Sequence, residues 1–125
     1  MLKNDFYSCQ EWQANDSEIT ARLTFNPDHA IFSGHFPGNP VVPGVCMMEI
    51  VKELLQEQVN HPLKLRTSGN VKFLQIITPL LQPVMKIAWK ENEKGYVVKA
   101  SIMLEDAAMF KFEGVFEAVT TVVRG

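Results

Sequence analysis

The sequence predicts an α+β domain in which one long helix packs against one large antiparallel sheet. Two patterns support this prediction. Apolar residues recur at helical spacing through the middle of the chain, and several other segments alternate between apolar and polar residues as half-buried strands do. A helix beside a large alternating sheet is typical of a domain in which the sheet covers the helix. The 125 residues fit one domain over residues 1–125, and 46% apolar residues suffice for a core.

The first third of the chain contains two predicted strands and a rigid loop. Residues 6–12 form a short mixed stretch that we assign as a first strand. Residues 18–25 alternate cleanly, and their apolar face carries Ile19, Ala21, Leu23 and Phe25. Proline then stands at every third position, at Pro37, Pro40 and Pro43. Each proline fixes φ and removes a backbone donor, so we expect an extended, polyproline-like loop.

The long helix follows this loop. Its apolar positions at helical spacing are Val45, Met48, Val51, Leu54, Leu55 and Val59. Pro43 suits a first helical position, and the helix should end near His61 and Pro62.

Four strands are predicted after the helix, over residues 65–77, 84–90, 96–104 and 108–118. The first should be interrupted at Ser68-Gly69-Asn70, and residues 91–95 should form a hairpin loop. In the last strand Met109 should face away from an apolar face that carries Ala108, Phe110, Phe112, Gly114, Phe116 and Ala118. Such a sheet has unpaired edges unless the protein dimerises.

Two ionisable side chains stand in the otherwise apolar stretch from Gly34 to Glu49. His35 opens the proline-rich loop, and Glu49 lies one turn into the helix. Apolar surroundings favour the protonated form of a carboxyl group, and a histidine beside such a group makes a general acid/base pair. The backbone N–H of Gly44, at the start of the helix, can polarise a carbonyl oxygen with the help of the helix dipole.

The motif is His35-Phe36-Pro37-Gly38-x-Pro40-x-x-Pro43-Gly44-Val45, with a carboxylate fourteen residues after the histidine. It resembles the signature of the 3-hydroxyacyl-[acyl-carrier-protein] dehydratases, which are hotdog-fold enzymes of fatty acid synthesis. The resemblance implies a hotdog fold, in which a curved antiparallel sheet wraps a long central helix. It also implies a carbon–oxygen lyase that converts (3R)-hydroxyacyl-[acyl-carrier-protein] to the trans-2-enoyl product in fatty acid, lipid or polyene biosynthesis.

The resemblance assigns roles to the residues of the motif. His35 acts at C2 of the acyl chain, Glu49 acts on the C3 hydroxyl group directly or through water, and the Gly44 N–H holds the thioester oxygen. The residues expected to bind substrate are Phe36, Pro43, Val45 and Ile50. No metal ion or organic cofactor is implied, because the elimination needs only acid and base. Glutamate rather than aspartate at position 49 resembles the branch that dehydrates without isomerising.

The resemblance also implies partners. Acyl carrier protein would deliver the substrate, and because carrier proteins are acidic, basic side chains should surround the entrance. The candidates near the motif are Lys52, Lys64, Arg66 and Lys72. Proteins of this family are dimers that often assemble further, and the histidine and carboxylate of one site come from two subunits. His35 would then face Glu49 of the other subunit in a homodimer, and a monomer would be inactive.

Four features depart from the family's pattern. Ile50 replaces a small alanine and should narrow the acyl tunnel, and Glu53 replaces a glutamine. Pro79-Leu80-Leu81 lacks the usual Pro-Gly-Asp turn, and the family's opening His-Arg-x-Pro-Phe-Leu segment is missing. These departures bear on acyl specificity and carrier-protein docking more than on the chemistry.

Two other functions stay open. A hotdog thioesterase or coenzyme A-thioester hydratase would share the fold, although the proline-rich histidine motif argues against it. A non-catalytic hotdog subunit would bind carrier protein, or a catalytic homologue, without turnover. Simpler structural roles also exist, since His35 can bond to the loop backbone and Glu49 can pair with Lys52. We expect His29 and His61 at the surface, because neither belongs to the motif.

Composition and charge argue against several classes of protein. The net charge is −2 without a basic run, so a nucleic-acid partner is not expected. The sequence lacks the roughly 18 consecutive apolar residues of a membrane span, and residues 1–5 lack the apolar region of a signal peptide. We therefore expect a cytoplasmic protein. In that reducing compartment Cys9 and Cys46 should be free thiols, with Cys46 a small core residue rather than a nucleophile.

Overall fold

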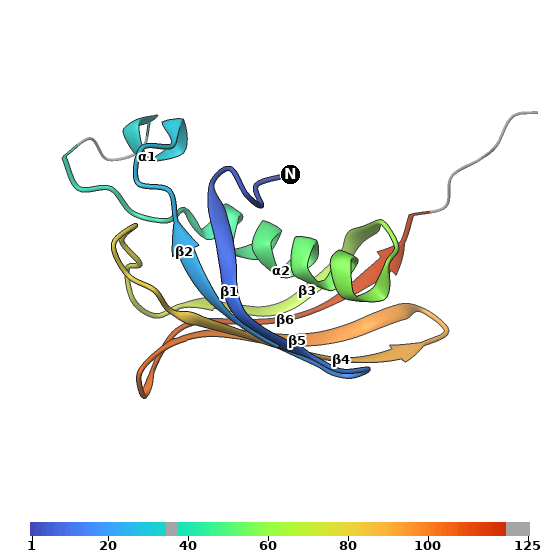
Figure 1. Ribbon diagram of the computed structural model, residues 1–125. Helices are drawn as coiled ribbons and strands as arrows, with labels where there is room; N and C mark the ends of the chain where they lie inside the picture. The colour runs from blue at the N-terminus through green and yellow to red at the C-terminus, as the bar shows by residue number, and fades with distance from the viewer. Residues whose placement is uncertain (35–37, 120–125) are drawn as a thin grey trace, which may run out of the picture.

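The computed structural model describes residues 1–34 and 38–119, which form one curved sheet and two helices (Figure 1). The elements are β1 (Tyr7–Ala14), β2 (Glu18–Phe25), α1 (Ala30–Gly34), α2 (Gly44–Val59), β3 (Leu63–Phe73), β4 (Val84–Asn92), β5 (Gly95–Leu104) and β6 (Ala107–Ala118). The strands pair in the order β1-β2-β4-β5-β6-β3, and every neighbouring pair is antiparallel. Helix α2 lies against the concave face of the sheet. The predicted α+β class and the hotdog arrangement are confirmed.

The alternating strands turn their predicted faces into the core. The buried residues of β2 and β4 include Ile19, Ala21, Leu23, Phe25, Met85, Ile87 and Trp89. On β6 the rings of Phe110, Phe112 and Phe116 form a row whose neighbouring centroids are 6.5 and 5.9 Å apart. Burying one large apolar side chain contributes ~1.5–3 kcal/mol. These rows therefore strongly favour the packing of the sheet against the helix that covers it.

Helix α2 covers the sheet with one apolar face. Its buried residues include Cys46, Met47, Ile50, Val51, Leu54 and Leu55. The helix ends before Asn60, whose left-handed backbone (φ 56°) stops it and whose N–H bonds to the Gln56 carbonyl. The predicted end of the helix near His61 is confirmed, whereas Pro43 is the N-cap rather than the first helical residue, because its ψ of 146° is extended. Val45, however, is 73% exposed, so the buried face begins at Cys46 rather than at Val45.

Strand β3 is continuous through Ser68-Gly69-Asn70, where the sequence predicted an interruption. Ser68 pairs with Gly114 of β6, but the next pair joins Val71 to Phe112, so β3 carries one extra residue between them. Such a bulge bends a strand without ending it. The small and polar residues in this stretch therefore mark a bulge rather than a break.

Strand β6 also carries an extra residue, at Met109. It lies between the pairs Ile102–Phe110 and Met103–Ala108. The bulge turns its side chain into the core, where it is 3% exposed, so the prediction that Met109 faces away is wrong. Its carbonyl accepts hydrogen bonds from the N–H groups of Leu74 and Gln75 (2.9 and 3.2 Å), which ties the chain after β3 to β6.

The short helix α1 follows β2 and was not predicted. The N–H of Ile31 donates to Nδ1 of His29 (3.1 Å), and Nε2 of His29 lies 3.1 Å from the Asp5 carboxylate. The imidazole also packs edge-on against Phe6, with centroids 5.3 Å apart. With a side chain only 16% exposed, His29 is not the surface residue that we predicted, whereas His61 is exposed as expected.

Residues 1–6, here called the N-terminal segment, are joined to α2 by a buried carboxylate. Glu53 is 1% exposed. It accepts hydrogen bonds from the N–H of Leu2 (3.1 and 2.9 Å to its two oxygens), the N–H of Lys3 (2.9 Å) and the hydroxyl of Tyr7 (3.2 Å). Burial and the neighbouring Glu53 raise the pKa of Tyr7, which keeps that hydroxyl a donor. These donors allow a carboxylate to lie in the core, since an unpartnered one would be costly.

Replacing Glu53 with glutamine should therefore destabilise the fold. A glutamine offers one acceptor oxygen and two N–H donors, so it cannot accept every hydrogen bond from Leu2, Lys3 and Tyr7. A buried donor left without an acceptor costs ~1–3 kcal/mol, and we expect a loss of this size in the free energy of unfolding measured by urea titration. Glu57→Gln is the matched control, because Glu57 is 51% exposed and its ion pair with Lys3 should contribute at most ~1 kcal/mol. Equal losses in both variants would contradict a special role for Glu53.

Candidate active site

The start of α2 carries the predicted site residues that the structure describes. Gly44, Val45, Glu49 and Ile50 lie in its first two turns, and Pro43 directly precedes it. The other two predicted residues, His35 and Phe36, lie outside the described part of the chain. The described part of the site therefore consists of the residues at the start of α2.

The backbone before α2 is extended and then turns into the helix. Pro43 has φ −64° and ψ 146°, the polyproline values that the sequence predicted. Its carbonyl accepts hydrogen bonds from the N–H groups of Cys46 (3.0 Å) and Met47 (3.2 Å). Within residues 1–34 and 38–119, the Gly44 N–H has no hydrogen-bond acceptor. An N–H group at a helix start that lacks an intrahelical acceptor can bind an oxygen atom of a ligand.

The start of α2 is fixed by the chain that follows β3. The ring of Phe73 packs against Gly44 so closely that a Cβ at this position would lie 2.7 Å from two of its atoms. The Val42 N–H donates to the Ile77 carbonyl (2.7 Å). Both contacts hold the helix start, and with it the Gly44 N–H, at a fixed place beside the sheet.

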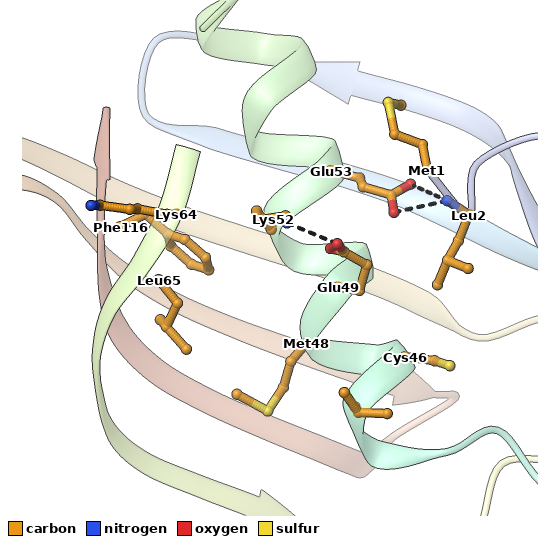
Figure 2. A pocket seen from close by; sticks show the side chains of 11 residues that line it. Met1, Leu2, Cys46, Met48, Glu49, Lys52, Glu53, Lys64, Leu65 and Phe116 are labelled. Carbon is orange, nitrogen blue, oxygen red and sulfur yellow. Dashed lines mark hydrogen bonds and ion pairs between the residues drawn. The ribbon is translucent and has the colours of Figure 1, made fainter. Parts of the chain in front are cut away.

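An open cavity of about 550 Å³ lies beside α2 and is lined also by the N-terminal segment and by residues of β3 and β6 (Figure 2). Its lining residues are Met1, Leu2, Val45, Cys46, Met48, Glu49, Lys52, Glu53, Lys64, Leu65 and Phe116. Figure 2 shows Met1 and Leu2 on one side of Glu49, and Leu65 and Phe116 on the other. The volume lies within the ~300–1,000 Å³ usual for small-molecule sites, which are also largely apolar with a few polar groups.

Glu49 faces this cavity, but apolar side chains are not its only neighbours. Its Oε1 lies 2.8 Å from Nζ of Lys52, three residues later on the same helix, and each side chain is 31% exposed. The sequence left two roles open for Glu49, a group in an apolar cleft and a partner of Lys52. The structure combines the two, because the carboxylate is both ion-paired and accessible to a ligand.

The other predicted helical residues divide between cavity and core. Val45 lines the cavity, whereas Ile50 is fully buried in the core and does not line it. Cys46 borders the cavity but is 7% exposed, and burial, followed by the nearby Glu49 carboxylate, raises the pKa of its thiol. The thiol is therefore not activated for nucleophilic attack. Both Cys46 and Cys9 are free, as predicted.

Two of the four candidate basic residues meet at the cavity. Lys52 and Lys64 both line it. Lys64 and Arg66 also pair with Glu117 of β6, at 3.3 and 3.9 Å. Lys72 lies further along β3 and does not line this cavity. The basic side chains at the cavity therefore come from α2 and from the first part of β3, and each is paired with a carboxylate, Lys52 with Glu49 and Lys64 with Glu117.

Sequence reasoning missed the N-terminal segment as part of the site. Met1 and Leu2 carry no motif, and Leu2 is held at the cavity by hydrogen bonds to Glu53, 51 positions away in the chain. Phe116 had a visible signal, because it belongs to the predicted apolar face of the last strand. Across residues 1–34 and 38–119, no group of three or more His, Cys, Asp or Glu side chains could hold a metal ion. No helix in the same ranges is long and apolar enough to cross a membrane.

Comparison with known proteins gives relatives in sequence and in structure. The curated relatives include the 3-hydroxyacyl-[acyl-carrier-protein] dehydratase FabZ of Brucella ovis, which is 32% identical over 102 aligned residues. That alignment covers 70% of this chain and 64% of the relative, so this chain spans less than two thirds of its length. FabZ of Wolbachia pipientis is 36% identical over 67 residues, which cover 46% of this chain and 43% of that protein.

Two solved structures share the fold. The dehydratase heterocomplex ApeI:P from Xenorhabdus doucetiae matches with a TM-score of 0.70 and 23% identity, over 83% of this chain and 90% of that one. An uncharacterized protein from Erwinia carotovora subsp. atroseptica matches with a TM-score of 0.63 and 22% identity, over 89% and 91% of the two chains. A family described as ApeI-like, the ApeI dehydratase, matches residues 11–112, and the chain therefore belongs to the ApeI-like dehydratase family.

Proposed function

We propose that this protein dehydrates (3R)-hydroxyacyl-[acyl-carrier-protein] to the trans-2-enoyl product, with His35 and Glu49 as the acid/base pair. The observation that carries the proposal is the position of Glu49. Its carboxylate is accessible from a largely apolar cavity, close to a helix start where the Gly44 N–H is free within the described chain. Membership of a dehydratase family and the FabZ relatives support the same reaction.

The chemistry divides between a base and an acid. His35 takes the proton from C2, a role that suits an imidazole because histidine is the side chain that ordinarily titrates near neutral pH. The Gly44 N–H and the helix dipole stabilise the charge that develops on the thioester oxygen. The C3–O bond then breaks as the Glu49–Lys52 pair passes a proton through water to the leaving hydroxyl group, which departs as a water molecule. The proton held by His35 is afterwards released to solvent, and solvent returns a proton to the pair. Because Lys52 is ion-paired with Glu49, we favour a route through water, in which the pair holds the water molecule that hydrogen-bonds to this hydroxyl.

The active unit in this proposal is a homodimer of one hotdog domain over residues 1–125. Support comes from β3, an edge strand in which nearly every residue is exposed. Apolar side chains there and just beyond are exposed too, including Leu65 (38%), Phe73 (55%) and Ile76 (70%). Unpaired strand edges with apolar side chains favour pairing with another chain. Acyl carrier protein would deliver the substrate in the cytoplasm, and the two free cysteines fit a reducing compartment.

The second candidate function is a non-catalytic subunit that pairs with a catalytic homologue. Two observations favour it. The ion pair with Lys52 occupies one oxygen of the Glu49 carboxylate, and a structural neighbour is described as a heterocomplex. Such a subunit would bind carrier protein without turnover. A thioesterase or coenzyme A-thioester hydratase would instead release free acid or hydrate an enoyl thioester.

The proposed roles predict the activity of two variants. His35→Ala and Glu49→Gln should each lower kcat/KM for dehydration of 3-hydroxyacyl-carrier-protein by about 10²–10⁴-fold, because each removes one proton-transfer group. Loss of water is followed by mass spectrometry with substrates of several chain lengths. His61→Ala is the control, and because His61 is exposed the change should stay within about twofold. Full activity in both variants would show that other groups perform the chemistry. Carrier-protein binding without turnover by the wild type would favour the non-catalytic subunit.

The shared site predicts complementation between the two inactive chains. A mixed dimer of a His35→Ala chain and a Glu49→Gln chain contains one site with both wild-type groups and one site with neither. Random mixing makes half of the dimers mixed, so about a quarter of the wild-type activity should return. If both groups of one site belonged to the same chain, mixing would restore no activity.

A further inference from the structure

One wall of the cavity beside Glu49 consists of the N-terminal segment, which the proposed mechanism does not use. Met1 and Leu2 form this wall (Figure 2). Met1 is 86% exposed, whereas Leu2 is half-buried and packs against the hydrophobic core. Leu2 is therefore the fixed part of the wall.

The carboxylate of Glu53 holds Leu2 at this place. Glu53 follows Glu49 by about one helical turn, so the two side chains leave α2 on the same side. The Glu53 carboxylate accepts the N–H of Leu2 with both oxygens (3.1 and 2.9 Å) and the N–H of Lys3 with one (2.9 Å), and Figure 2 shows the bonds to Leu2. Two consecutive backbone N–H groups bound to one carboxylate fix both the position and the direction of the chain at Leu2.

Other contacts keep the N-terminal segment from moving away. The ammonium group of Lys3 lies 5.2 Å from the centre of the Trp12 ring. Phe6 is fully buried, and its ring stacks on that of Phe32 with centroids 4.9 Å apart. The chain that follows Leu2 is thus anchored, and with the bonds from Glu53 to Leu2 it gives a ligand in the cavity a fixed surface at Leu2.

We propose that Glu53 is a positioning residue and Leu2 a specificity-determining residue. Glu53 fixes the N-terminal segment so that the Leu2 side chain limits the length of the acyl group that the cavity accepts. This inference rests on the proposed function, because it requires an acyl chain in this cavity. Glu53 itself takes no part in proton transfer, since its carboxylate is 1% exposed and its oxygens already accept hydrogen bonds from three groups.

The proposal predicts opposite effects for two substitutions of Leu2. Leu2→Ala removes side-chain volume from the wall and should admit longer acyl chains. Leu2→Trp adds volume and should exclude them. Neither substitution removes the backbone N–H that binds Glu53. A loss of stability alone would not move the chain-length preference in opposite directions.

The experiment measures kcat/KM for dehydration of short-chain and long-chain 3-hydroxyacyl-carrier-protein by the wild type and both Leu2 variants. The ratio of the long-chain to the short-chain value should rise about tenfold or more in Leu2→Ala and fall by a similar factor in Leu2→Trp, since even one methylene group in an apolar pocket changes such a ratio by about 10–200-fold. Leu104→Ala is the matched control. Leu104 is also half-buried and packs against the core, at the end of β5 opposite to the part that pairs with Phe116. Its ratio should stay within about twofold of the wild-type value.

Glu53→Gln tests the positioning step. It should shift the chain-length ratio in the same direction as Leu2→Ala, because a loosened segment also opens the wall. In a protein that already carries Leu2→Ala, Glu53→Gln should shift the chain-length ratio less than it does in the wild type, since both substitutions act on the same wall. Independent, additive shifts would contradict the idea that Glu53 acts through Leu2. If Glu53→Gln does not fold, the two Leu2 variants still decide the proposal.

The outcomes separate this inference from the proposed function. If the wild type dehydrates the substrate but the chain-length ratio is unchanged in both Leu2 variants, Leu2 does not limit acyl length. The proposed function is then unaffected. No dehydration of any substrate by the wild type overturns the proposed function. In that case the affinities for saturated short-chain and long-chain acyl-carrier-protein, measured by calorimetry, take the place of kcat/KM. An unchanged ratio of affinities in both Leu2 variants would then also contradict the proposal that Leu2 limits acyl length.

Discussion

The packing of one face of α2 against the concave sheet is the interaction on which the rest of this structure depends. Ile50, Val51, Leu54 and Leu55 are all fully buried in that contact. Once this face packs on the sheet, the helical period places the residues of the opposite face away from that contact, and Glu49 belongs to this opposite face. Gly44, held under the Phe73 ring, sets where the helix begins. The position of the site therefore follows from the formation of the core.

Two glutamates on α2 have different roles because their surroundings differ. Glu53 is buried, and within the described residues the hydrogen bonds that it accepts come from the N-terminal segment and from Tyr7 at the start of β1, so it fastens the chain. Glu49 lies about one turn earlier, is 31% exposed and has Lys52 as its ionic partner. A carboxylate whose oxygens are occupied by fixed donors contributes rigidity, whereas one that opens on a cavity is accessible to a ligand. Residue type alone does not distinguish these roles.

The edges of the sheet connect the fold to the proposed assembly. The bulges in β3 and β6 keep these strands continuous, and the Met109 carbonyl binds the chain that leaves β3. This support lets β3 run for 11 residues as an edge strand with almost no cover of its own. A long exposed edge with apolar side chains is a surface that natural proteins cover or pair. The shared active site that we propose would meet this need at the same time as it brings two chains together.

Sequence patterns predicted the α+β class, the C-terminal end of α2 and the buried faces of β2 and β4, because these depend on local periodicity and on proline and turn residues. They also singled out the motif from His35 to Glu49. Tertiary structure alone decided the rest. Met109 is buried because of a bulge, which depends on how two strands pair. Lys52 and Lys64 meet at one cavity, and Leu2 lines it, because α2, β3 and the N-terminal segment pack side by side. These contacts join residues far apart in the chain, and local sequence patterns do not indicate which distant residues will come into contact.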